Sequence, residues 1–338
     1  MPNSRCGRAI LVAWALFSAA CARPSELVTK GGGQADVAGV NLLLRSLLEV
    51  TDEPLEVDNI TVTIEPTGKL NASYTQGGQY SVTRGLLRAA TKEQLKAILA
   101  HEIAHHELRH PEILASHPVW VPGDVSEEWK RQLALQQVMS LKRKHELEAD
   151  LQAVRILERV GSSGEVLEHT LQWLKTVSRE PDRPPGVLTM ADLVASHPPT
   201  EGRIAALREC IYHAICGQLW TRPGASQPER LAFAYLFPLE RRIVAELPVP
   251  ERRHVRAAII ERVDAASESH TVRNIRGVSR TLSVRSTAEV YANCSGVQRR
   301  VVMRALAPDD PVILVLEPPT GNAITVRRIE IYGCKDGG

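Results

Sequence analysis

The sequence predicts an α+β chain: a mainly helical domain with a small β-sheet, followed by a smaller β-rich C-terminal domain. Segments with apolar residues at helical spacing dominate the first part of the chain. From about residue 270 onward, short alternating segments are separated by turn residues instead. The chain has 338 residues, 43% of them apolar and 24% charged, which is enough for two folded domains. We place the helical domain at 37–219, a helical connector at 220–269 and the C-terminal domain at 270–338.

Residues 1–21 have the features of a signal peptide. Arg5 and Arg8 precede an apolar run at 9–17 that is too short for an ordinary membrane span. No later run of roughly 18 apolar residues follows, so the mature chain is not expected to span a membrane. We therefore expect export to the periplasm of a bacterial envelope.

The end of this segment resembles a bacterial lipoprotein processing site. Small residues precede Cys21, which would be lipidated and become the mature N-terminus, although Ser18 stands where such sites usually carry Leu. Ordinary cleavage after the stretch 20–22 is the alternative. Residues 22–36 contain three consecutive glycines, and we interpret them as a flexible tether between a lipid anchor on the membrane and the folded body.

The remaining cysteines agree with an exported protein. Cys210, Cys216, Cys294 and Cys334 are even in number and lack the spacing of a zinc site. Cys210 with Cys216 and Cys294 with Cys334 is the economical pairing, but four cysteines allow three pairings, and free thiols are the alternative.

The charge balance does not favour a nucleic-acid partner. The formal net charge is +2, and no block of like charge stands out.

The helical domain opens with a helix and a small sheet. Residues 39–50 have the spacing of a helix with one buried face, and β-branched or aromatic segments follow at 59–64, 73–75 and 80–83. A second helix then begins after Thr91, a good N-cap residue, and nothing breaks it before Pro111.

This second helix carries the motif His101-Glu102-Ile103-Ala104-His105. At about 100° per residue, the two histidines lie about 40° apart around the helix, with Glu102 inside the same arc of roughly 100°. Two neutral imidazoles one turn apart can share Zn²⁺, and Glu102 is placed to take a proton from zinc-activated water. A solvated helix face is the alternative.

More histidines follow. A third zinc ligand of the extended type would stand six residues after His105, where the chain has Pro111. We therefore interpret His106, His110 and His117 as surface residues or neighbours of the ligands.

A long helix predicted from Ser126 to about Val160 offers a carboxylate instead. Glu146 and Asp150 are four residues apart and face the same way, so Glu146 could reach the metal while Asp150 accepts a hydrogen bond from a liganding histidine. Asp124, 19 residues after His105, is the rival third ligand. The alternative is that these acidic residues belong to an exposed charged face of the helix.

Four ordered motifs carry a resemblance to a known family. They are the strand pair Asn71-Ala-Ser-Tyr74 and Ser81-Val-Thr-Arg-Gly-Leu-Leu87, the motif at 101–105, Glu146-Leu-Glu-Ala-Asp150, and Ser196-His-Pro-Pro-Thr-Glu-Gly-Arg-Ile204. Over roughly 37–210 the chain resembles the zinc metallopeptidases that include the CAAX prenyl endopeptidases, the membrane protease HtpX and exported bacterial chaperone-proteases.

The resemblance implies a zincin-like endopeptidase with zinc on His101, His105 and Glu146, and Glu102 as catalytic base. The lack of membrane-spanning segments points to the exported soluble branch. We expect hydrolysis of extended or misfolded envelope proteins, bound along an edge strand of the sheet. A chaperone-like or scaffold protein with a latent metal site is the alternative function.

The fourth motif also contains His197. If its loop packs over the cleft, His197 either donates a hydrogen bond to the oxyanion or fills the open position on zinc. A loop histidine bonded to backbone is the alternative.

Beyond the third motif we predict helices at 165–175, 201–215 and 227–268, the last broken at Pro238, Pro248 and Pro250. Five β-segments are predicted after these helices, at 281–285, 289–292, 301–306, 312–317 and 324–332.

Overall fold

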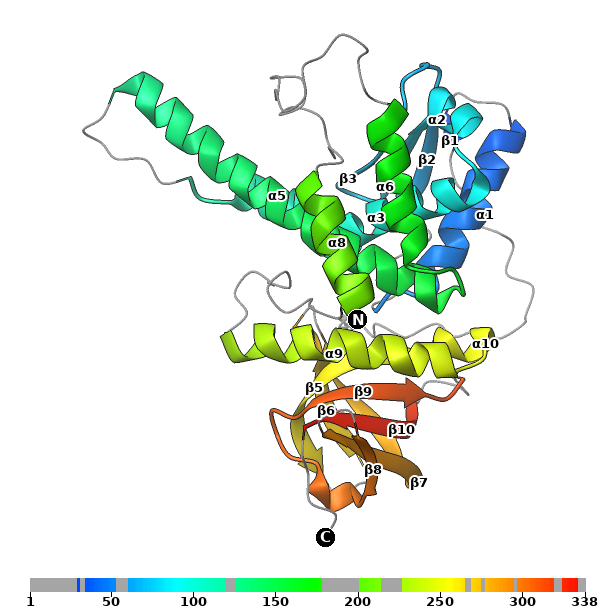
Figure 1. Cartoon of the computed structure of the whole chain (residues 1–338), viewed down its shortest axis with the longest axis vertical. Helices are drawn as coiled ribbons and strands as arrows, with labels where there is room; N and C mark the ends of the chain where they lie inside the picture. The colour runs from blue at the N-terminus through cyan, green and yellow to red at the C-terminus, as the bar shows by residue number, and fades with distance from the viewer. Residues whose placement is uncertain are drawn as a thin grey trace, which may run out of the picture.

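The computed structural model describes residues 29–30, 34–52, 60–119, 126–177, 201–213, 227–264, 269–274, 277–294, 297–318 and 324–333. A helical part with a small sheet lies on one side of helix α9, and a β-barrel lies on the other (Figure 1). This is the predicted α+β class. The predicted signal peptide and most of the tether lie outside the described residues, as do Asp124, His197, Cys216 and Cys334.

The predicted elements of the helical part appear in the predicted order, together with a strand at 29–30 and helices at 84–89 and 110–116 that were not predicted. Its helices are α1 Gln34–Leu48, α2 Arg84–Ala89, α3 Lys92–Glu107, α4 His110–Ser116, α5 Glu127–Arg159, α6 Glu165–Val177 and α8 Glu201–His213. Its strands are β1 Thr29–Lys30, β2 Thr61–Glu65, β3 Ala72–Thr75 and β4 Gln79–Thr83. Strand β1 and the first turn of α1 lie within the segment that we predicted to be a tether.

The small sheet has the order β1-β2-β4-β3, which puts β3 at one edge. Strands β1, β2 and β4 run parallel, and β3 pairs antiparallel with β4. The tight turn between β3 and β4 is made by Gly77 and Gly78, which have φ values of 85° and 78° that favour glycine. Helix α3 packs against β3.

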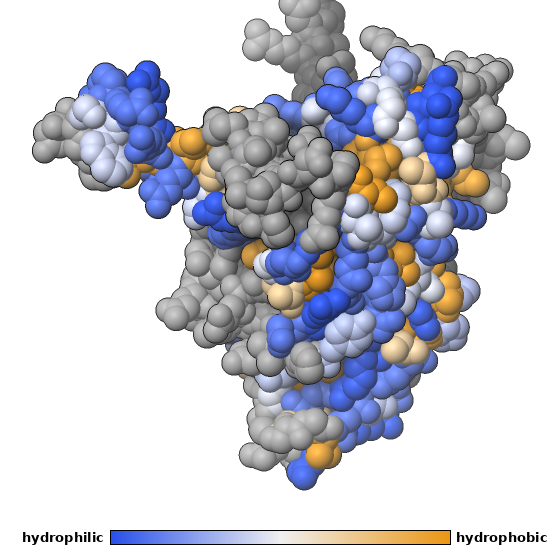
Figure 2. Space-filling view, turned by 45° about the horizontal axis from the view of Figure 1, so that its top comes forward, coloured by the Kyte–Doolittle hydropathy of each residue, from blue (hydrophilic) through white to orange (hydrophobic). Residues whose placement is uncertain are grey.

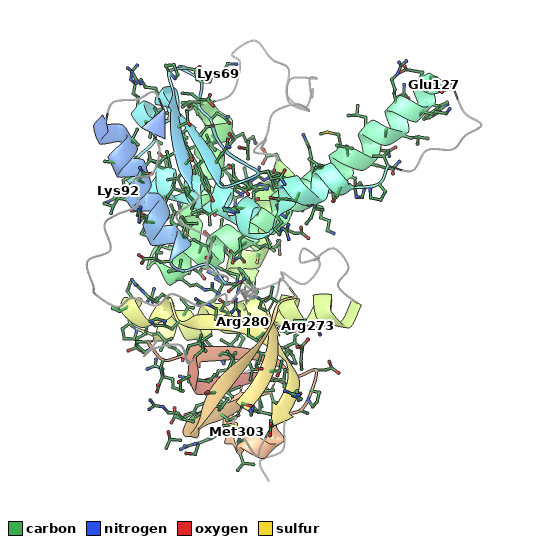
Figure 3. The ribbon with its side chains drawn as sticks, turned by 180° about the vertical axis from the view of Figure 1, so that it is seen from behind. Lys69, Lys92, Glu127, Arg273, Arg280 and Met303 are labelled. Atoms are coloured by element: carbon green, nitrogen blue, oxygen red, sulfur yellow. The ribbon has the colours of Figure 1, made fainter. Side chains whose placement is uncertain are left out.

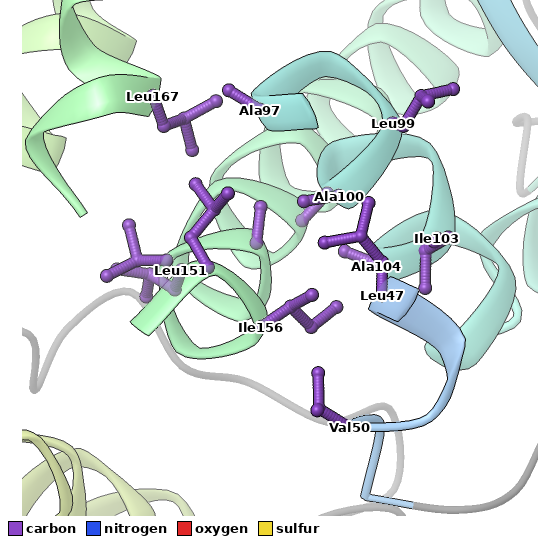
Figure 4. Packing of buried hydrophobic residues seen from close by; sticks show 14 of the residues in the cluster. Leu47, Val50, Ala97, Leu99, Ala100, Ile103, Ala104, Leu151, Ile156 and Leu167 are labelled. Carbon is purple, nitrogen blue, oxygen red and sulfur yellow. The ribbon is translucent and has the colours of Figure 1, made fainter. Parts of the chain in front are cut away.

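Helix α3 is positioned by its cap and by small residues. Thr91 and Gln94 form a capping box at its start. The side chains of Ala97, Ala100 and Ala104 are fully buried. In Figure 4, Ala97 lies beside Leu167 of α6, and Ala100 and Ala104 lie on the side toward Ile156 of α5. Because alanine side chains are short, the two helices can approach closely, which brings the histidines of α3 within reach of α5.

Helix α5 is 33 residues long, and only its second half belongs to the core. The first half projects from the body, with Glu127 near its tip (Figures 1 and 3), and its surface is mostly hydrophilic in Figure 2. Local ion pairs, such as Lys130 with Glu127, lie near its tip. From His145 onward the helix is mostly buried, so the predicted motif at 146–150 lies where the helix enters the core.

The C-terminal part is a barrel. Its strands are β5 Val255–Asp264, β6 Ser269–Asn274, β7 Ser279–Cys294, β8 Val297–Val301, β9 Pro311–Leu316 and β10 Thr325–Tyr332. Strands β10, β9, β5, β6 and β7 pair in that order, and β10 also pairs in parallel with β7, which closes a five-stranded barrel. Strand β8 extends from the second half of β7. In Figure 3, Arg273 and Arg280 lie near α9, and Met303 lies at the opposite end.

The structure corrects three details here. The predicted helix at 227–268 is confirmed only as α9 Gln227–Glu246 and the short α10 Val249–Arg252, since 255–264 is strand β5. The two segments predicted at 281–285 and 289–292 form the single strand β7, and 301–306 contains the 3₁₀ turn Met303–Ala305.

The predicted break at Pro238 is also wrong, because α9 continues through it. Proline costs a helix one backbone hydrogen bond. Its neighbours Leu236, Phe237 and Leu239 are all buried, and their packing outweighs that cost.

A buried ionic network connects the helical part to α9. Arg155 and Arg159 of α5 both contact Asp52 after α1 and Glu240 of α9, at N–O distances of 2.6 to 2.8 Å. All four side chains are at most 3% exposed. The two carboxylates and two guanidiniums balance in charge, as buried ions require.

Two further observations concern the predicted location. Within the described residues, no helix is both long and apolar enough to cross a membrane. Cys210 and Cys294 are each disulfide-bonded, but their predicted partners Cys216 and Cys334 lie outside the described residues, so the predicted pairing stays a prediction.

Candidate metal centre

Three buried side chains from two helices converge on one point. His101 and His105 come from α3, and Glu146 comes from α5. The two Nε2 atoms lie 3.1 Å apart. Glu146 Oε2 lies 3.3 Å from His101 Nε2, and Oε1 lies 3.5 Å from His105 Nε2. The two ligands predicted from the motif and the carboxylate favoured as the third are thus brought together.

These separations fit a tetrahedral zinc ion. Ligand atoms about 2.0–2.1 Å from a tetrahedral centre lie about 3.3–3.4 Å from one another. Burial alone would lower the pKa of His101, but its hydrogen bonds to Asp150 and Glu146 raise that pKa to about 9. The site therefore favours a positive charge between these side chains. Two histidines and one carboxylate form a set of ligands that binds Zn²⁺.

Asp150 lies where the sequence predicted it, beside His101. Its Oδ1 is 3.0 Å from His101 Nδ1, which leaves Nε2 directed at the metal position. Burial would raise the pKa of Asp150, but Arg203 and His101 outweigh this and lower it. Asp150 is therefore an anion that accepts a hydrogen bond from the ring.

Arg203 of α8 is a member of this site that the sequence analysis missed. Its guanidinium donates hydrogen bonds to Asp150, with Nη2 2.7 Å from Oδ1, and forms an ion pair with Glu146, with Nη1 2.9 Å from Oε2. It is buried, and it separates two acidic groups that would otherwise repel each other. Arg203 stands in the fourth motif, and a basic residue there could have been matched to the paired acids of the third.

Glu102 follows the ligand His101 on α3 and contacts the edge strand. Its Oε2 accepts a hydrogen bond of 2.8 Å from the backbone N–H of Tyr74 in β3. The side chain is buried and does not belong to the three-residue cluster. This contact fixes the carboxylate at the outer edge of the sheet.

The backbone of β3 explains this contact. Thr83 N donates to Asn71 O, so residues 71 and 83 form a hydrogen-bonded pair in the antiparallel ladder. Such pairs alternate along a ladder, and Tyr74 is paired with Tyr80 in a position that directs its N–H outward. The outer edge of β3 thus faces the metal centre.

The other three histidines differ from one another. His106 is half-buried, stacks on Tyr74 and hydrogen-bonds to Tyr80 OH, so it supports the sheet. His110 is buried beside His105, with the two Nδ1 atoms 2.8 Å apart. His117 is half-buried near the end of the described segment. The rival ligand Asp124 and the loop residue His197 both lie outside the described residues, so their roles stay predictions.

Comparison with known proteins identifies the family. Residues 36–121 and 128–211 match the model of peptidase family M48, which amounts to half of the chain. A comparison with curated proteins finds no match. The matched segments carry α3 and α5, the two helices that supply the metal ligands. The cluster of His101, His105 and Glu146 fits a zinc site, and the chain belongs to peptidase family M48 and is a zinc metalloendopeptidase.

Proposed function

We propose that this protease cleaves extended or misfolded segments of bacterial envelope proteins, as an exported member of its family. The observation that carries the proposal is that Glu102, which follows the ligand His101 on α3, also contacts the backbone of the edge strand β3. A carboxylate in that place reaches both a substrate paired with β3 and the centre that activates water.

Substrate binding follows from the sheet. An extended peptide can add to the edge of β3 as a further strand, using the outward N–H and C=O of Ala72 and the C=O of Tyr74, because the Tyr74 N–H already donates to Glu102. A folded protein rarely offers a free extended segment. This geometry therefore selects unfolded or misassembled chains.

The chemistry is divided among named side chains. When bound, zinc polarises the scissile carbonyl and lowers the pKa of water toward 7. Glu102 accepts the proton of the attacking water and delivers it to the leaving amine. Asp150 keeps Nε2 of His101 directed at the metal, and Arg203 fixes Glu146.

The test is cleavage of a permanently unfolded protein by the full chain. We expect casein to be cut, a stable folded protein to be spared, and cleavage to stop with a chelator and return with zinc. Glu146→Ala should lose both zinc and cleavage, while Asp124→Ala should keep both. Retained zinc in Glu146→Ala would reject the ligand assignment, and casein binding without cleavage would favour the scaffold alternative.

The proposed location rests on the N-terminal sequence. A lipid on Cys21 would hold the protease at the membrane of the envelope, with residues 22–36 as spacer. We expect a Cys21→Ser variant to move from the membrane fraction to the soluble periplasmic fraction. If the variant still sediments with membranes, the anchor is elsewhere.

A further inference from the structure

A second group of buried side chains lies on the Nδ1 side of His105. It consists of His110 from α4 and His145 and Glu148 from α5, which are 3%, 3% and 5% exposed. Each offers a nitrogen or carboxylate oxygen within 4.8 Å of the others. None of the three is a ligand of the zinc site, so their burial needs another explanation.

A left-handed turn brings His110 to this place. Helix α3 ends at Glu107, and Arg109 then has a φ of 57°, a conformation that costs a non-glycine residue roughly 1 kcal/mol. Helix α4 starts at His110 immediately after this turn. The ring consequently faces back toward α3, and its Nδ1 is 2.8 Å from that of His105.

The zinc site determines which atoms carry hydrogens. His105 Nε2 faces His101 and Glu146, so it must keep its lone pair to bind zinc. A neutral His105 therefore carries its hydrogen on Nδ1 and donates it to His110 Nδ1. A neutral His110 then carries its own hydrogen on Nε2, which is 3.3 Å from Glu148 Oε2.

We propose that Glu148, His110 and His105 form a hydrogen-bonded relay that fixes the tautomer and orientation of His105 as a zinc ligand. The inference rests on zinc being held by His101, His105 and Glu146. His110 and Glu148 are positioning residues, since neither touches the metal or the substrate. Asp150 orients the ligand His101 directly. Glu148 orients the ligand His105 through the ring of His110.

His145 holds the relay in shape. Its ring stacks face to face on His110, with centroids 4.1 Å apart and planes 4° apart, while His110 and His105 meet at 74°. A flat surface behind His110 prevents its ring from rotating about χ2. The edge-to-face contact with His105 is then maintained.

A second metal ion is the competing use of this cluster. Nε2 of His145 has no hydrogen-bond partner among the described residues, as an unfilled ligand would. However, a cation at this position needs the lone pair of His110 Nε2, and the hydrogen order derived above places a proton there. Both sites could be filled together only if the histidine pair lost an additional proton, so the geometry favours the relay.

The test is zinc affinity, measured by competition with a chromogenic chelator. We expect His110→Leu and Glu148→Leu each to raise the Kd for zinc, by about 10–100-fold for the histidine. His110→Gln should recover part of the affinity, because its amide oxygen can accept from His105 Nδ1. In the variant that combines His110→Leu with Glu148→Leu, the loss of zinc affinity should equal that of His110→Leu alone. Glu148 acts on His105 only through His110, so removing it as well has no further effect. His169→Leu, an exposed histidine of α6, is the matched control and should bind zinc as the natural chain does.

Several outcomes would overturn the relay. One is a zinc Kd for His110→Leu within twofold of that of the natural chain. Another is a loss of zinc affinity in the double variant that equals the sum of the two single losses. The third is a natural chain that binds two zinc ions, one of which is lost in His145→Leu. If the Leu variants do not fold, His110→Gln and Glu148→Gln decide, with both expected to bind zinc more weakly than the control. Affinity is read without a substrate, so a natural chain that binds zinc but cuts nothing contradicts the proposed function and not the relay.

Discussion

Glu102→Gln should reduce peptide hydrolysis by about 10²–10⁴-fold while the protein keeps one zinc ion and its fold. The amide cannot accept a proton from water, but it has nearly the shape of the carboxylate, and its oxygen can still accept the hydrogen bond of Tyr74 N–H. Because Glu102 makes no metal bond in our assignment, zinc should remain. Hydrolysis of casein and zinc content per chain are measured together.

Glu93→Gln is the matched control for this variant. Glu93 lies on the same helix, with a side chain that is 51% exposed, and should leave activity unchanged. Zinc loss in Glu102→Gln would mean that the carboxylate is a ligand. Full activity with zinc present would place the catalytic base elsewhere.

Glu240→Gln should destabilise the protein by about 3–5 kcal/mol. The substitution removes one of two carboxylates that Arg155 and Arg159 share, and it leaves a guanidinium charge uncompensated in a site where these side chains are at most 3% exposed. Water cannot screen that charge. Urea unfolding of the two proteins at neutral pH gives the difference.

The control is Glu246→Gln on the same helix, where the side chain is 49% exposed and little change is expected. A second variant tests the cause. Arg155→Met with Glu240→Leu removes one charge of each sign and leaves Asp52 paired with Arg159, so part of the stability should return. An unchanged midpoint in Glu240→Gln would show that the network contributes nothing.

Local geometry made part of the site predictable. His101, Glu102 and His105 lie within five residues of one helix, and its periodicity alone sets their relative directions. The same argument placed Glu146 and Asp150 on one face of α5. What periodicity could not supply was the distance between the two helices, which depends on the alanines packed between them.

Residues defined by distant partners were missed. Arg203 has a role only because α8 crosses α5 at Glu146 and Asp150. His110 was judged by its spacing from His105, and that spacing gave no indication of the left-handed turn at Arg109. Glu148 lies between Glu146 and Asp150, which were predicted as site residues, but it points to another face of the helix.

The same limit applies to the fold. The apolar run within Val255–Asp264 suits a buried strand or a buried helix, and the neighbouring strands of the barrel decide between them. Strands β2, β3 and β4 before α3 have the alternation of strands with one buried face, and these three were predicted in order.

The closure of the barrel bears on how the chain is made. Strand β10 lies between β9 and β7, and it is the last of the six strands to leave the ribosome. Until it emerges, both of these neighbours present unpaired backbone groups, which readily pair with other chains. The chain is therefore most exposed to misassociation before β10 has joined the barrel, and a released chain truncated after Leu316 would remain in that state.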